Sequence, residues 1–231
     1  MKITKIALYL FWVSCFLVIL SLVIKDKDLL IVSTTVTVPS IFFYYCNKVK
    51  HINYLFILSL FCFYLIDLIG LMRFENEIAY IFFPLLISYS VLIYFVIQDY
   101  QKIKFQTFEV CVSIFVLFLI LILLFTILNL IDIDSYYLLI SFLIIAFSLV
   151  FLCMMVLINT FTQNNFSNFY FSLSCFCYYF NNCFYAIQKT IIFLPVFVYL
   201  AVILKLVSYY FIVRYIIFRK TKPGFTILHN Y

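Results

Sequence analysis

The stretch that decides the fold is YLFILSLFCFYLIDLIGLM, residues 54–72. It contains a single charged residue, Asp67, and polar residues flank it, with Asn53 before and Arg73 after. As a helix rising 1.5 Å per residue it would be about 28 Å long. That length matches the roughly 30 Å hydrocarbon core of a bilayer. The stretch therefore predicts a helix that spans a membrane.

The same pattern recurs along the whole chain. Backbone groups in lipid must be satisfied within their own segment, so long apolar runs favour helices. The predicted class is all-α: a polytopic integral membrane protein with a bundle of eight transmembrane helices. One membrane domain would cover residues 1–218, followed by a short cytoplasmic tail, 219–231. The eight runs are 6–24, 29–46, 54–72, 78–98, 110–131, 136–158, 169–188 and 191–218, with a polar loop at 159–168.

Composition excludes several other classes of protein. The chain has 231 residues, of which 68% are hydrophobic and 10% are charged, whereas soluble domains have about 25% charged residues. The net charge of +6 comes from scattered Lys and Arg without a basic stripe, so we expect no nucleic-acid partner. Cys175 and Cys177 lack a His or a second Cys pair to complete a metal site. No HExxH, GxSxG or P-loop motif is present, and we expect neither metal nor cofactor.

Loop charge predicts the orientation of the bundle, because Lys and Arg accumulate on the cytoplasmic side. Nine basic residues fall on one side of the predicted bundle and four on the other. This asymmetry predicts a multi-pass membrane protein with both termini in the cytoplasm. The nine are Lys2, Lys5, Lys48, Lys50, Lys102, Lys104, Arg219, Lys220 and Lys222; the four are Lys25, Lys27, Arg73 and Lys189.

Polar residues inside the runs are the candidates for function, because a charge within the bilayer is costly and marks a site by default. Asp67 is the clearest case; the alternative is a carboxylate satisfied by water or Tyr hydroxyls. Asn181 and Asn182 should lie at the depth of Asp67, although Asn pairs also act as glue between helices. Lys205 would either extend to the interface or reach toward Asp67.

With these residues placed, the chain resembles the YhhN-like lysoplasmalogenase family, which consists of eight-helix membrane enzymes. The family's second helix carries a K-P-L-x-x-P stretch, and Pro39 corresponds to its last proline. Its third helix carries G-D-x-x-L, and Asp67 keeps the acid. Its fourth carries H-I-x-Y, and Tyr94 keeps the aromatic residue. Its seventh carries S-D-x-x-x-A-x-x-K-F, of which Lys189 remains while Asn182 replaces the acid.

The resemblance implies cleavage of the vinyl ether bond of lysoplasmalogens, with Asp67 and Asn182 at the catalytic positions. Residues expected to bind the substrate are Asn181, Tyr94, Lys189 and Lys205. The expected partners are membrane lipids, in particular a lysophospholipid. Because an amide cannot exchange a proton at neutral pH, we expect weak, altered or lost hydrolase activity. Two alternatives stay open: a small proton- or ion-coupled carrier that uses Asp67 and Lys205, and a non-catalytic scaffold.

Overall fold

The computed structural model describes residues 2–72, 77–99, 136–163, 166–190 and 194–219, together with single residues between 111 and 125. The predicted span 110–131 lies outside these residues, apart from those single positions, and so does the tail from residue 220 on. The helices are α1 (Lys2–Ile24), α2 (Lys27–Cys46), α3 (Tyr54–Met72), α4 (Glu77–Asp99), α6 (Tyr136–Gln163), α7 (Phe166–Thr190) and α8 (Pro195–Phe218).

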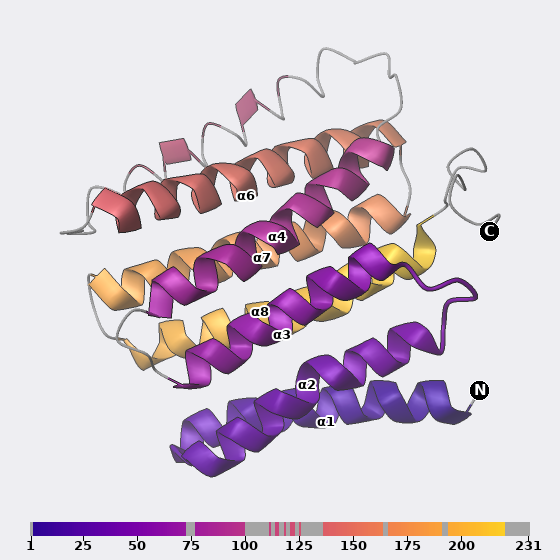
Figure 1. Ribbon diagram of the computed structural model, residues 1–231, viewed down its shortest axis with the longest axis vertical. Helices are drawn as coiled ribbons and strands as arrows, with labels where there is room; N and C mark the ends of the chain where they lie inside the picture. Colours follow the sequence, from indigo (N-terminus) through magenta and orange to yellow (C-terminus); the bar gives the residue numbers. More distant parts are fainter. Residues whose placement is uncertain are drawn as a thin grey trace.

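The protein is an all-α, multi-pass membrane protein. Among the described residues, six helices are long and apolar enough to cross a bilayer. The helix outside that group is α7, which carries Asn, Ser and Tyr side chains along its length. It nevertheless runs alongside α6 and α8 as part of the same bundle (Figure 1).

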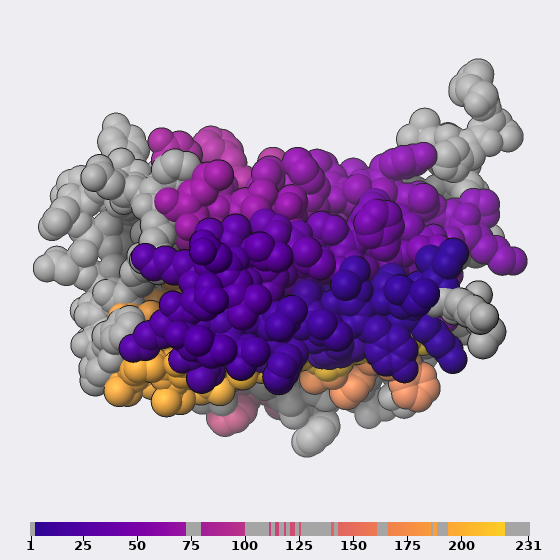
Figure 2. All heavy atoms as spheres, turned by 90° about the horizontal axis from the view of Figure 1, so that it is seen from below, coloured from indigo at the N-terminus to yellow at the C-terminus, as the bar shows by residue number. Residues whose placement is uncertain are grey.

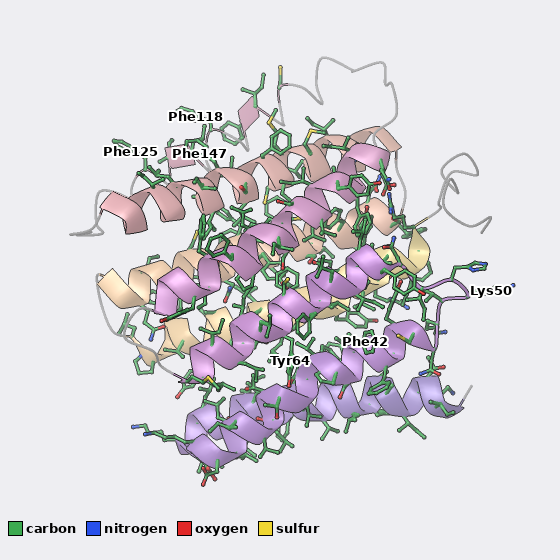
Figure 3. The ribbon with its side chains drawn as sticks, viewed as in Figure 1. Phe42, Lys50, Tyr64, Phe118, Phe125 and Phe147 are labelled. Carbon is green, nitrogen blue, oxygen red and sulfur yellow. The ribbon has the colours of Figure 1, made fainter. Side chains whose placement is uncertain are left out.

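The helices form a closed ring. Going around it, α1 packs on α2, α2 on α3, α3 on α4, α4 on α6, α6 on α7, α7 on α8, and α8 again on α1 and α2. Figure 1 shows the helices lying side by side, with the start of α1 and the end of α8 at the same end of the bundle. In the space-filling view α1 and α2 form one continuous surface (Figure 2). Apolar side chains such as Phe147 cover the outer edge, while Lys50 lies beyond the helix ends (Figure 3).

Large aromatic side chains fill the interior of the ring. The Cα atoms of α3 do not come within 8 Å of those of α7 or α8, so only long side chains can bridge that space. Phe63 of α3 and Tyr178 of α7, for example, stack with ring centroids 5.0 Å apart. The fully buried aromatic residues are Phe11, Tyr45, Phe56, Phe63, Tyr89, Phe95, Phe171, Tyr209 and Tyr215.

The predicted polar loop at 159–168 is wrong for most of its length, because α6 continues to Gln163 and α7 begins at Phe166. The polar side chains find partners that allow the helices to extend. The Asn159 amide donates to the Val96 carbonyl at 3.1 Å, and the Asn168 amide donates to the Asn159 carbonyl at 3.1 Å. Polar residues that bond across a helix interface do not have to reach water.

Two of the other helix starts that differ from the predicted runs have a local cause. The carboxylate of Asp26 accepts hydrogen bonds from the backbone N–H groups of Asp28 and Leu29, so α2 begins at Lys27. This is an ordinary N-cap, which satisfies free donors in the first turn. At the other end of the chain, Pro195 occupies the first turn of α8, where its missing N–H is not needed.

Candidate functional site

Asp67 on α3 is held by two side chains of α8. Its carboxylate accepts a hydrogen bond from Lys205 Nζ at 2.7 Å and another from Tyr209 Oη at 2.9 Å. Lys205 and Tyr209 are four residues apart, so one face of α8 presents both groups to α3. Lys205 was predicted either to extend to the membrane interface or to reach toward Asp67. The structure shows that it reaches Asp67.

The ion pair is buried on its acidic side and partly open on its basic side. The Asp67 side chain is 3% exposed and the Lys205 side chain is 26% exposed. A charge taken out of water requires an opposite charge and hydrogen bonds, and Asp67 receives both. The turn of α8 that follows Lys205 is also held against α7, because the Ser174 hydroxyl of α7 donates to the Ser208 carbonyl at 3.0 Å.

Asn182 on α7 makes its own contact across the ring. Its amide donates to the Tyr89 hydroxyl of α4 at 3.1 Å. Within the described residues no hydrogen bond joins Asn182 directly to Asp67. Asp67 and Asn182 instead each reach a different tyrosine, Tyr209 and Tyr89.

Four rings lie between these two polar groups, and we call them the aromatic cluster: Phe63 of α3, Tyr89 of α4, Tyr178 of α7 and Tyr209 of α8. Tyr178 contacts the other three, with centroid distances of 5.0 Å to Phe63, 6.5 Å to Tyr89 and 6.2 Å to Tyr209. Tyr209 then reaches Asp67, and Tyr89 reaches Asn182. The two predicted catalytic positions therefore each hydrogen-bond to a tyrosine of one cluster.

The remaining predicted site residues are more scattered. Tyr94 is 44% exposed on α4, and Asn181 is half-buried beside Asn182. Lys189 falls near the end of α7, and its side chain lies outside the described residues. Of the four residues expected to bind substrate, the structure places Lys205 against Asp67.

Sequence reasoning allowed for Tyr hydroxyls beside Asp67, as Tyr209 now shows, but it did not identify the tyrosines of the aromatic cluster. Helical spacing could have indicated two of them, because Tyr209 lies four residues after Lys205 and Tyr178 lies four residues before Asn182. Residues at that spacing share a helix face. Tyr89 carries no such signal, since α4 has no buried charge at that depth within the described residues.

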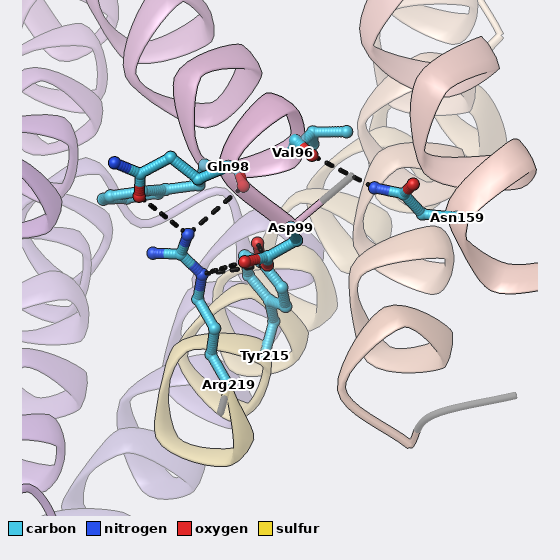
Figure 4. A network of polar contacts seen from close by, with 7 residues as sticks. Val96, Gln98, Asp99, Asn159, Tyr215 and Arg219 are labelled. Atoms are coloured by element: carbon cyan, nitrogen blue, oxygen red, sulfur yellow. Dashed lines mark hydrogen bonds and ion pairs between the residues drawn. The ribbon is translucent and has the colours of Figure 1, made fainter. Parts of the chain in front are cut away.

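A second polar network lies where α4 and α8 end (Figure 4). Arg219, which the sequence assigned to the tail, places Nε 2.8 Å from both carboxylate oxygens of Asp99. Its Nη2 donates to Gln98 Oε1 at 2.9 Å and to the Phe95 carbonyl at 3.3 Å. The Tyr215 hydroxyl also donates to Asp99. This network fastens the end of α8 to α4.

The two networks differ in what they offer chemically. The Asp99–Arg219 network satisfies its charges with several bonds each and lies at the helix ends. The Asp67 group combines one carboxylate, one ammonium and one phenol in the interior, against stacked rings whose other member Tyr89 bonds to the Asn182 amide. Lys205 and Tyr209 can donate protons and Asp67 can stabilise a cation, whereas Asn182 can only form hydrogen bonds.

In comparisons with known proteins, no protein-family model, no curated protein and no solved structure matches this chain.

Proposed function

We propose that this chain is a lysoplasmalogenase-like protein of the bacterial inner membrane, with both termini cytoplasmic, that binds a single-chain lipid beside Asp67. The observation that carries the proposal is the shared aromatic cluster: positions 67 and 182, to which the family resemblance assigns catalysis, border the same four rings. A site of this kind provides charged groups for a polar headgroup and an apolar surface for a chain.

The proposed reaction is hydration of a vinyl ether. A proton adds to the outer vinyl carbon, water adds to the resulting oxocarbenium ion, and the hemiacetal breaks into an aldehyde and a free alcohol. The ion pair with Lys205 favours Asp67 as the carboxylate that stabilises the cation. The proton would then come from Lys205 or Tyr209, both of which bond to Asp67.

The amide at Asn182 limits this chemistry. A second carboxylate could activate the water, a role that contributes about 10²–10⁴ in rate in other enzymes. Asn182 instead donates to Tyr89, so the proposed activity is slow. Replacing Asn182 by Asp should raise it.

The test is release of aldehyde from a lysoplasmalogen by the purified protein in detergent micelles. We expect a low rate for the natural protein, a rate about tenfold or more higher for Asn182→Asp, and loss of activity in Asp67→Asn. Asp99→Asn is the matched control, since it neutralises the carboxylate of the other network and should retain activity. No aldehyde from either the natural protein or Asn182→Asp, or equal rates with and without Asp67, would contradict the proposal.

A second candidate function is a proton-coupled carrier, and the Asp67–Lys205 pair favours it. Protonation of a carboxylate that links two helices would release its ammonium partner and allow α8 to move against α3. Such a carrier would move solute in proteoliposomes under a pH gradient. The flux would be lost in Asp67→Asn, and no aldehyde would form from a lysoplasmalogen.

A further inference from the structure

Arg214 on α8 lies in a setting that the Asp67 site does not explain. Its guanidinium carbon lies over three rings, at 5.4 Å from the centroid of Tyr170, 5.6 Å from Tyr210 and 4.8 Å from Phe218. Nη1 donates to the Tyr44 hydroxyl at 3.5 Å. The Nε atom is buried without a hydrogen-bond partner among the described residues.

Helix geometry places Arg214 away from the proposed lipid site. Nine residues separate it from Lys205, which corresponds to about 180° around the helix and roughly 13–14 Å along it. Lys205 faces the interior, so Arg214 faces the outside of the ring, between Tyr44 of α2 and Tyr170 of α7. Phe218, one turn further, is 45% exposed.

The charge of Arg214 has no carboxylate partner among the described residues. The two acids buried in the bundle interior and at its helix ends are already bound: Asp67 pairs with Lys205, and Asp99 pairs with Arg219. Aromatic faces attract a cation but do not neutralise it. An arginine at membrane depth is costly, so an external anion would stabilise it.

We propose that Arg214 binds the phosphate group of an anionic phospholipid. A planar guanidinium suits phosphate because it can form two parallel hydrogen bonds, and the Tyr44 hydroxyl lies within reach of the same group. The rings of Tyr210 and Phe218 provide an apolar wall along which an acyl chain can lie. Lys50 follows α2 at the same end of the bundle but is not part of this site. This site is independent of the proposed hydrolase.

The chain contains a natural reporter for this site. Trp12 is its single tryptophan, and its ring lies 5.3 Å from that of Tyr210. Because Trp12 is 42% exposed, bromine on a neighbouring acyl chain can quench its fluorescence. The purified protein would be placed in phosphatidylcholine vesicles that contain either brominated phosphatidylglycerol or brominated phosphatidylcholine at equal mole fraction. The ratio of the two quenching curves gives the preference for the anionic lipid.

We expect a preference of about fivefold, the ratio that corresponds to about 1 kcal/mol for one basic residue at a membrane surface. Arg214→Gln should abolish it, and Arg214→Lys should keep part of it. Lys50→Gln is the matched control, because it removes one positive charge at the same end and should leave the preference unchanged. Millimolar inorganic phosphate should have no effect.

Three results would overturn the proposal. An unchanged preference in Arg214→Gln would exclude the residue, and equal loss in Lys50→Gln would assign the preference to surface charge in general. Displacement of the lipid by inorganic phosphate would show that the site takes free phosphate. An unchanged Trp12 emission maximum in phosphatidylcholine alone shows that each variant is folded.

Discussion

Tyr209 and Tyr178 lie next to each other in the aromatic cluster, but their hydroxyls have different surroundings. Tyr209 Oη donates to the Asp67 carboxylate at 2.9 Å, whereas Tyr178 Oη is buried without a hydrogen bond among the described residues. A hydrogen bond to a charged group contributes about 1.5–3 kcal/mol. An unsatisfied hydroxyl contributes nothing of this kind and costs desolvation.

Tyr209→Phe should therefore lower the free energy of unfolding by about 1.5–3 kcal/mol. Tyr178→Phe, which keeps the same ring in the same cluster, should be neutral or slightly stabilising. Denaturant-induced unfolding in detergent micelles measures both. Equal losses in the two variants would show that the Asp67 contact contributes no stability.

The sequence could indicate which residues matter at this scale but not how they pair. Asp67 and Lys205 are conspicuous because charges are rare in apolar runs. Their pairing depends on the rotation of α3 and α8 about their axes, and apolar residues surround both helices too evenly to define it. Tyr94 illustrates the same limit, since the resemblance placed it in the site and the structure leaves it 44% exposed.

At the scale of the elements, the Asp99–Arg219 network defines where α8 ends. Arg219 makes hydrogen bonds to Asp99, Gln98 and the Phe95 carbonyl of α4. Arg219→Gln removes the ion pair, while Tyr215 still donates to Asp99. The last turn of α8 should then open more often, because its remaining contacts with α4 are fewer.

Hydrogen exchange measures this opening. Amides of residues 213–218 should exchange faster in Arg219→Gln, and amides around Lys205 should be unchanged, since that residue is about 21 Å away along the helix. Uniformly faster exchange along α8 would mean that the network stabilises the whole helix and not its end. Unchanged exchange would mean that the network does not hold the end at all.

Helix positions were predictable from the sequence and helix ends were less so. The run 54–72 coincides with α3, because polar residues bound it on both sides. The ends of α6 and α7 were misjudged, because a polar side chain in a sequence does not show whether it will bond to water or to a neighbouring helix. Asn159 and Asn168 bond to protein carbonyls, so the helices continue through a segment that resembles a loop.

On the scale of the whole molecule, the ring closes because α8 packs between α7 and the α1–α2 pair. The membrane class follows from composition. The alternating directions of α1 to α4, and of α6 to α8, follow from the short connections between these helices. The order of helices around the ring could not be predicted, since it depends on bridging contacts such as Asp67–Lys205 between segments far apart in the chain.

The ring places Lys50 and Lys27 at opposite ends of the bundle, because α2 begins at Lys27 and ends at Cys46, just before the loop that holds Lys50. Lys27→Cys and Lys50→Cys should therefore react with a membrane-impermeant maleimide from opposite sides of the membrane. The natural protein, labelled in parallel, gives the background from its own cysteines. Labelling of both positions in intact cells would contradict the crossing of α2.

We claim that the Asp67–Lys205 pair joins α3 to α8 inside the membrane. A double-mutant cycle tests this pairing. Asp67→Asn and Lys205→Met should each cost on the order of 3 kcal/mol, at the low end for buried pairs because Lys205 is 26% exposed. The double variant should cost at least about 1 kcal/mol less than the sum. Asp67→Asn with Arg219→Gln, which belong to separate networks, should be additive. Additivity of Asp67→Asn and Lys205→Met within about 0.5 kcal/mol would contradict the claim.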